Sequence, residues 1–305
     1  MEKTRSRSFL IILLTYVLAV ITGIFVYKLT GSLWEIKGII PKIFIADTVA
    51  TILVWLAGVY YKNSSVYDPY WSVAPPVIMI LLAFHLNILA PGSIPASLVL
   101  LLSAVCFWSI RLTANWAYTF RDLGVQDWRY TKFRNDFPGI WQLINFFGIH
   151  YMPTLIVFFA LLPALVVMEN LHTSPDSVGP VNVLTFAGFA ISTGAVLLQL
   201  FADRQLHKFR RFNSGKVCET GLWKYARHPN YSGEILMWWG VYIMSISVLP
   251  FHYWWTGLGA TLNTLMFLFI SIPLMEHRQM SNKPEYASYK DRVSALTFIR
   301  KSTKT

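Results

Sequence analysis

Long apolar runs constrain the fold of this chain more than any other feature of its sequence. Runs of about 20 residues, enough to cross a bilayer, lie near residues 9–27, 43–61, 73–91, 97–117, 148–168 and 183–203. One further apolar region, 233–273, is interrupted at Leu249 and Pro250. The sequence therefore predicts an all-α, polytopic membrane helix bundle, with residues 1–305 as a single integral membrane domain. We expect eight transmembrane helices if the last region is split, and seven if its two short halves form a re-entrant pair.

Composition and charge agree with a membrane protein. Hydrophobic residues make up 55% of the chain and charged residues only 13%, against about 25% charged residues in soluble domains. Most Lys and Arg residues fall in the tails and loops that eight spans place on one side of the membrane. The positive-inside rule assigns that side to the cytoplasm. We therefore expect both termini in the cytoplasm, in a bacterial inner membrane or an endoplasmic reticulum.

Several classes of site are disfavoured by the sequence. The two cysteines, Cys106 and Cys218, give neither a disulfide framework nor a metal-ligand spacing. There is no glycine-rich dinucleotide loop, Walker loop or His-Glu-x-x-His motif. Basic residues lie at the ends of the spans instead of on a separate domain face, which argues against a nucleic acid partner. We expect no bound metal, and membrane lipids as partners.

A dense polar run enters the last apolar region. Asn230, Glu234 and Trp238 recur there every four residues, so a helix places them on one face. A carboxylate inside a membrane helix is costly unless another group pairs with it. Arg227 and His228, just before this helix, are the nearest candidates in the sequence.

A second polar stripe runs out of the sixth apolar run. Gln199, Asp203, His207 and Arg210 recur at intervals of four, four and three residues. One interpretation is a basic helix end that anchors at the lipid surface. The other is a functional site, because Gln199 and Asp203 lie too deep for lipid headgroups and need an internal partner.

The loop between these two stripes combines basic and aromatic residues. Positive-inside bias alone explains such basic residues, but arginine also presents a planar fork of donors that matches phosphate oxygens. Aromatic side chains could bracket a flat heteroaromatic ring by stacking. The loop residues concerned, with the aromatic residues that follow, are Arg210, Arg211, Lys216, Trp223, Lys224, Tyr225, Arg227, Tyr231 and Trp238.

Two further polar positions lie upstream. Trp108, Arg111 and Tyr118 follow helical spacing in the fourth run, and Arg111 needs a carboxylate or phosphate partner there. A structural ion pair with Asp68 or Asp47 is one possibility. Asp68 itself precedes a proline at the start of the third run, so it is either a helix cap or an acid that faces a ligand.

These motifs resemble those of the steroid 5-alpha-reductase superfamily. The chain is more closely similar to the mostly bacterial membrane proteins catalogued as domain of unknown function 1295. The runs Gly-Leu-Trp-Lys-Tyr and Arg-His-Pro-Asn-Tyr-Ser-Gly-Glu carry the resemblance, together with shorter matches at residues 68–71, 127–130 and 286–289. It covers residues 45–300 and leaves residues 1–42 as an added N-terminal span and loop.

The resemblance implies a reductase that binds NADPH from the cytoplasmic side. Such an enzyme reduces a carbon–carbon double bond conjugated to a carbonyl in a lipophilic, steroid- or isoprenoid-like substrate. With the residues argued above, the candidate cofactor-binding set is Arg111, Arg121, Gln199, Asp203, His207, Arg210, Lys216, Tyr225, Arg227, His228, Asn230, Tyr231, Glu234, Trp238 and Arg278.

The catalytic candidates are Asp68, Trp108 and Tyr118. Trp108 stands where the steroid enzymes have a tyrosine that engages the substrate carbonyl. An indole N–H donates a hydrogen bond but has no readily transferred proton, so Asp68 or Tyr118 is a candidate for the group that polarises the carbonyl. Gln199 and His207 also depart from the family pattern, which has Asn and Arg at these positions.

Two other functions remain open at this point. The Arg-His-Pro-x-Tyr run is shared with isoprenylcysteine carboxyl methyltransferases, which use S-adenosylmethionine. A transporter or lipid-binding protein is the non-enzymatic alternative, with the intramembrane charges forming a pathway. The number of basic residues near Arg210 favours a phosphorylated cofactor over a zwitterionic one.

Overall fold

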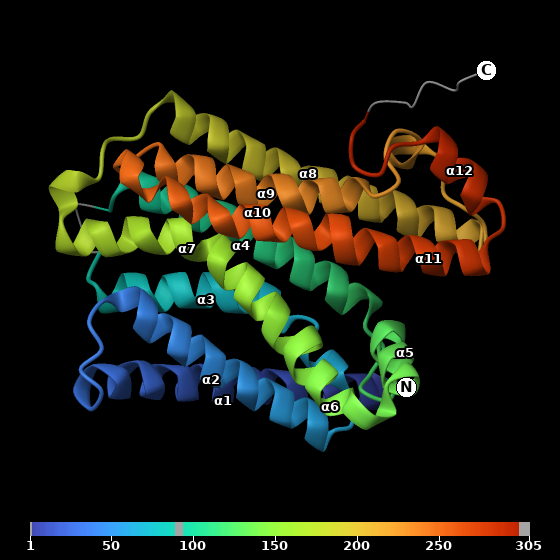
Figure 1. Ribbon diagram of the computed structural model, residues 1–305, viewed down its shortest axis with the longest axis horizontal. Helices are drawn as coiled ribbons and strands as arrows, with labels where there is room; N and C mark the ends of the chain where they lie inside the picture. Colours follow the sequence, from blue (N-terminus) through green and yellow to red (C-terminus); the bar gives the residue numbers. More distant parts are fainter. Residues whose placement is uncertain (1, 89–93, 299–305) are drawn as a thin grey trace. The chain divides into compact units, whose positions relative to one another are not determined.

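The computed structural model describes residues 2–88 and 94–298, where the regular secondary structure is helical (Figure 1). The prediction of an all-α fold is confirmed. The predicted end of the third span near residue 91 lies outside the described residues. The α-helices are α1 Glu2–Ser32, α2 Ile39–Tyr60, α3 Tyr70–His85, α4 Ala96–Thr119, α5 Trp128–Asp136, α6 Trp141–Leu143, α7 Met152–Thr173, α8 Val183–Phe212, α9 Pro229–Ile246, α10 Leu258–Met266, α11 Ile272–Asn282 and α12 Tyr286–Arg292.

Seven helical segments of the described chain are long and apolar enough to cross a membrane. Some join several consecutive helices without a break. They are Thr4–Ser32, Ile39–Tyr60, Ser64–His85, Ala96–Thr119, Pro138–Thr173, Val183–Phe212 and Phe251–Asn282. By the length and composition of these segments, the chain is an integral, multi-pass membrane protein.

The last apolar region is divided where the sequence predicts, but its second half is not short. Helix α9 ends at Ile246, and the next helical segment begins at Phe251. That segment runs on through α10 and α11 to Asn282, 32 residues in all, or about 48 Å at 1.5 Å per residue. The two halves are therefore not both short, and the number of crossings, seven or eight, stays a prediction. Hydropathy alone underestimates the length of this segment, because charged residues near the end of α11 interrupt the apolar run.

The residues group into two compact units. The first contains residues 1–94 and 112–176, and so includes α1 to α3 and α5 to α7. Its core is rich in aromatic side chains, with Tyr16, Tyr67 and Tyr70 buried together against Val54 and Val66. The phenol of Tyr16 donates to the carbonyl of Val66 at 2.7 Å, so this core ties α1 to the segment before α3.

The second unit contains residues 95–111 and 177–305, and its centre is the close packing of α8 against α9. Figure 1 shows these helices side by side with α10. A Cβ atom on Gly240 would lie 2.7 Å from the carbonyl oxygen of Gly188, and one on Gly233 would lie 2.7 Å from that of Ala195. Small residues thus let the two backbones approach. This approach places the polar stripe of α9 against that of α8.

Candidate functional site

The buried carboxyl group of Glu234, on α9, is held by three side-chain donors. Its Oε1 accepts from the indole N–H groups of Trp108 at 3.0 Å and Trp238 at 3.1 Å. Its Oε2 accepts from Trp108 at 2.9 Å and from Gln199 Nε2 at 3.2 Å. The side chain is 5% exposed. Because a buried carboxyl group is costly without such donors, these contacts account for an acid in the middle of α9.

An ion pair between α4 and α8 continues the hydrogen bonding. Arg111 Nη2 contacts Asp203 Oδ2, and Arg111 Nη1 donates to Gln199 Oε1 at 2.5 Å. Asn230, in the first turn of α9, donates to Asp203 Oδ1 at 3.2 Å. Gln199 therefore links the two acids, since its oxygen accepts from Arg111 while its nitrogen donates to Glu234.

Together these side chains form what we call the buried polar network. All of its members are among the residues predicted from the sequence, and all lie in the second unit. They are Trp108, Arg111, Gln199, Asp203, Asn230, Glu234 and Trp238. One donor, the Nε–H of Arg111, is buried without a hydrogen-bond partner in the described part of the chain.

The chain matches the protein family described as "Protein of unknown function (DUF1295)" over residues 54–293. It belongs to this family. The match takes in the whole buried polar network and leaves out α1 and most of α2. The resemblance to this family that the sequence predicts is thereby confirmed.

One curated relative of this DUF1295 protein is the "Uncharacterized protein C594.04c" of Schizosaccharomyces pombe (strain 972 / ATCC 24843). The two are 25% identical over 268 residues, which cover 79% of this chain and 74% of the relative. No solved structure is significantly similar to the chain.

Two predicted pairings are wrong in this DUF1295 protein. Arg111 pairs with Asp203 on α8, not with Asp68 or Asp47. The pairing of Glu234 with residues just before α9 is also wrong, because its donors come from α4, α8 and α9 itself. Spacing along one helix does not indicate which neighbouring helix its polar face meets.

Arg227 and His228 instead form a clamp on the C-terminal segment. Arg227 Nε donates to Glu276 Oε1 at 2.7 Å, and its Nη1 donates to the carbonyl oxygens of Lys290, at 3.0 Å, and Val293. His228 Nε2 lies 3.2 Å from the same Glu276 oxygen. Lys290 Nζ lies 3.1 Å from Glu276 Oε2. These residues, which we call the C-terminal clamp, join the start of α9 to α11 and to the end of α12.

A basic cluster lies near the ends of α8 and α11. Lys283 Nζ donates to the carbonyl oxygen of Lys216 at 2.9 Å. Burial lowers the pKa of Lys283, and the positive charges of Arg210 and Arg278 lower it further, although Glu285 opposes them. Arg210, Lys216 and Arg278 are predicted from the sequence. Lys283 is not among the residues predicted from the sequence. The only feature that could have indicated it is its place in the basic tail after the last apolar run.

The remaining candidates of the second unit have varied surroundings. The ring of Tyr231 stacks on that of His228, with centroids 5.1 Å apart. Tyr225 is 45% exposed. His207 is partly buried and lies one turn after Asp203 on α8.

Asp68, Tyr118 and Arg121 lie in the first unit, whereas Trp108 lies in the second. The Oδ1 atom of Asp68 accepts from the phenol of Tyr130 at 2.7 Å. Helix α3 has no side-chain cap at its start, so the helix-cap interpretation of Asp68 is wrong. Tyr118 is 73% exposed, and Arg121 is exposed as well.

Proposed function

We propose that this protein is an NADPH-dependent membrane reductase. Its substrate would be lipophilic, steroid- or isoprenoid-like, and would carry a carbon–carbon double bond conjugated to a carbonyl. The observation that carries the proposal is the buried polar network, because the candidate cofactor-binding set contains all of its members except Trp108, which stands where the steroid 5-alpha-reductases engage the substrate carbonyl. The members of the network come from three helices and lie within hydrogen-bond contact of one another. NADPH, when bound, supplies the hydride.

The basic cluster suits the phosphate groups of such a cofactor. Burial is the main cause of the lowered pKa of Lys283, and the positive charges of Arg210 and Arg278 lie close enough to lower it further. An anion between these charges would relieve their repulsion. Arginine and lysine side chains bind phosphate oxygens through charge-assisted hydrogen bonds. We therefore assign the phosphates to this cluster.

The buried polar network suits the uncharged polar part of the cofactor. Arg111 Nε–H has no partner among the described residues and can donate to a ligand oxygen. Asp203 and Gln199 orient the guanidinium of Arg111, and Glu234 orients Gln199 in turn. Glu234 thus positions Arg111 through one intermediate residue. Preorganised donors of this kind stabilise charge without reorganising during a reaction.

We assign the polarising hydrogen bond on the substrate to Asp68 or Tyr118. The indole N–H of Trp108 already donates to Glu234, so it is a positioning group in this arrangement. Asp68 has the phenol of Tyr130 as a partner, which orients its carboxyl group. We further propose that the active site and both termini face the cytoplasm, in a bacterial inner membrane or an endoplasmic reticulum.

Cofactor binding by the purified protein is the first test. NADPH is titrated into protein in nanodiscs, with energy transfer from tryptophan to nicotinamide as the signal. We expect saturable binding that weakens with salt, and loss of nicotinamide absorbance when a hydrophobic enone is added. Lys283→Ala should weaken binding about tenfold, or about 1.4 kcal/mol. Glu234→Ala should abolish binding in a protein that remains folded.

The matched control is Lys132→Ala, which removes an exposed lysine that pairs with Asp136 at 2.5 Å in the first unit. Its NADPH affinity should equal that of the parent protein. Absence of both NADPH binding and enone-dependent NADPH oxidation would overturn the reductase. Unchanged affinity in Glu234→Ala would leave Glu234 with a structural role only.

Which cofactor the protein binds distinguishes the reductase from the methyltransferase and from the non-enzymatic function. In the structure, Arg227 and His228 of the shared Arg-His-Pro-x-Tyr run contact Glu276, so this run does not distinguish the two cofactors. Calorimetric titrations with S-adenosylmethionine and with NADPH, run side by side, distinguish the two cofactors. Binding of S-adenosylmethionine alone supports the methyltransferase, and binding of neither supports a transporter or lipid-binding protein.

A further inference from the structure

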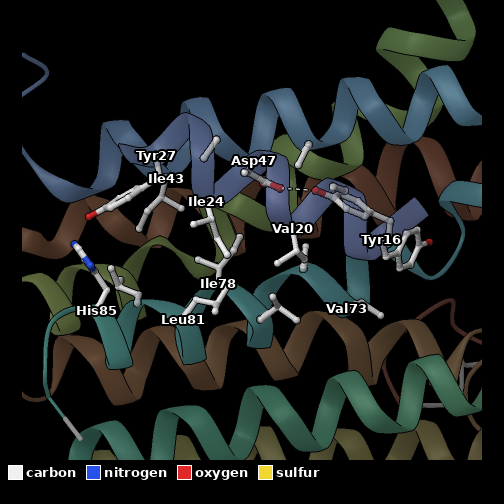
Figure 2. Close-up of a pocket in the computed structure, with 18 of the residues that line it drawn as sticks. Tyr16, Val20, Ile24, Tyr27, Ile43, Asp47, Val73, Ile78, Leu81 and His85 are labelled. Atoms are coloured by element: carbon white, nitrogen blue, oxygen red, sulfur yellow. Dashed lines mark hydrogen bonds between the residues drawn. The ribbon is translucent and has the colours of Figure 1, made fainter. Parts of the chain in front are cut away.

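A largely apolar cavity of about 220 Å³ lies in the first unit, between α1, α2 and α3 (Figure 2). All three helices belong to candidate membrane spans. Apolar side chains such as Val20, Ile43 and Ile78 line most of it. The polar exceptions are Tyr16, Tyr27, Lys28, Asp47, Tyr70 and His85.

Asp47 is the side chain that gives the cavity chemical character. It is 9% exposed, and its Oδ1 accepts a hydrogen bond from the phenol of Tyr70 at 3.0 Å. Figure 2 shows this bond, with the carboxyl group at the cavity wall. No second hydrogen bond to this carboxyl group occurs among the described residues. The other oxygen is not fully enclosed by the protein, so it can accept a hydrogen bond from a ligand in the cavity.

The shape of the cavity matches one chain of a lipid. Figure 2 shows Tyr27 and His85 facing each other at one end, where their rings are 5.3 Å apart, Tyr16 at the other end, and Asp47 between the two ends. Tyr16 and Tyr27 lie about 17 Å apart along α1, at ~1.5 Å per residue. This is close to half of the hydrocarbon thickness of a bilayer, about 30 Å in full.

We propose that this cavity binds a lipid alcohol, with its apolar body among α1, α2 and α3 and its hydroxyl group hydrogen-bonded to Asp47. A fatty acid placed with its carboxylate at Asp47 fits less well, because two carboxyl groups would then face each other. An ammonium group would cost more free energy to bury than a hydroxyl group. Asp47 and all of α1 lie outside the residues matched by the family. The site is additional to the proposed cofactor site and does not depend on reductase activity.

Photolabelling of the full chain tests this proposal. The protein is reconstituted in phosphatidylcholine vesicles that contain a diazirine-bearing hexadecanol, and in parallel its methyl ether, which cannot donate a hydrogen bond. After irradiation, labelled peptides are mapped by mass spectrometry. We expect the alcohol to label cavity-lining residues of α1 to α3 about fivefold more than the ether, a factor typical of one hydrogen bond.

Variants connect the labelling to the cavity. Asp47→Leu should reduce labelling by the alcohol to that by the ether, while Asp47→Asn, which keeps an acceptor oxygen, should retain most of it. Ala74→Phe should fill the cavity and reduce labelling by both probes. Leu18→Phe, on an exposed position of α1, is the matched control and should change neither.

Each contrary result overturns the proposal. Equal labelling by the alcohol and the ether would remove the role of the hydroxyl group. Labels on exposed positions such as Leu18 would show adsorption to the lipid-facing surface only. Stronger labelling by the corresponding amine would replace the alcohol by a cationic lipid. If Asp47→Leu does not fold, Asp47→Asn takes its place in the comparison of the two probes. Monodisperse elution of Asp47→Asn then shows that this variant is folded.

Discussion

At the scale of single residues, the buried polar network depends on the orientation of one amide group. Gln199 is fully buried, accepts from Arg111 and donates to Glu234. Only a side chain that both accepts and donates can make these two contacts at once. An apolar replacement would leave Arg111 Nη1 without this acceptor, and Glu234 Oε2 would keep only Trp108 as a donor. A buried polar group without a partner costs about 1–3 kcal/mol.

The C-terminal clamp leads to a prediction about pH. Burial lowers the pKa of His228, and the hydrogen bond to Glu276 opposes this effect without cancelling it. In the unfolded chain a histidine has a pKa of about 6.5. Below that pH the unfolded state takes up the proton more readily than the folded state, so stability falls as the pH decreases from about 6.5 towards the lower folded value.

The measurement is the midpoint of thermal unfolding in detergent, between about pH 7.5 and pH 5. His228→Gln keeps a donor for Glu276 and cannot titrate. We expect its midpoint to decrease less with acid than that of the parent protein. Identical pH dependence in the two proteins would assign the acid sensitivity to another group.

At the scale of elements, the packing of α8 against α9 determines whether the buried polar network can form. A Cβ atom on Gly240 would meet the backbone, at 2.7 Å from Gly188 O and 2.8 Å from Ser192 N. Backbone atoms cannot rotate away as a side chain can, so the two helices would have to separate. The acid of α9 and its donor on α8 would then move apart as well.

Gly240→Ala should therefore lower the stability of the protein by about 1–3 kcal/mol, the usual cost of overpacking. Gly194→Ala, on α8, is the matched control, because nothing lies within 4 Å of the added Cβ atom. Alanine is also the better helix former, by about 1 kcal/mol. Thermal midpoints of both variants in detergent provide the comparison. Equal decreases in the two variants would contradict the close approach of α8 and α9.

At the scale of the whole molecule, the sequence predicts which segments are helical better than it predicts which residues meet. Apolar runs predict the helices because the hydrocarbon of a bilayer offers no hydrogen bonds. The backbone N–H and C=O groups of a spanning segment must therefore bond to one another, as they do in a helix. Helical spacing identifies Glu234 and Gln199 as polar positions that need partners. It does not identify Trp108 as the donor to Glu234, nor Glu276 as the partner of Arg227, because such contacts join distant helices. Lys283 follows no helical spacing, and only its place in the basic tail distinguishes it in the sequence.

The last prediction concerns the side of the membrane on which the termini lie. The described residues contain seven candidate spans besides α9. With 18 residues, α9 is about 27 Å long, close to the ~30 Å of a hydrocarbon layer. If α9 also crosses, the number of crossings is even and both termini lie on one side. The basic tails favour the cytoplasm.

We therefore expect short tags at the two termini to have the same protease accessibility, cleaved in inside-out vesicles and protected in right-side-out vesicles. A tag in the loop between α8 and α9, near Lys216, should behave like both termini. A tag between α9 and the segment that begins at Phe251 should show the opposite pattern. Opposite accessibility of the two termini would instead leave seven crossings and place α9 within one side of the membrane. In that case the loop near Lys216, which follows six spans, would stay on the side of the N-terminus. The C-terminal tail with Lys283 would face the other compartment, which the hydrogen bond from Lys283 Nζ to the carbonyl oxygen of Lys216 argues against.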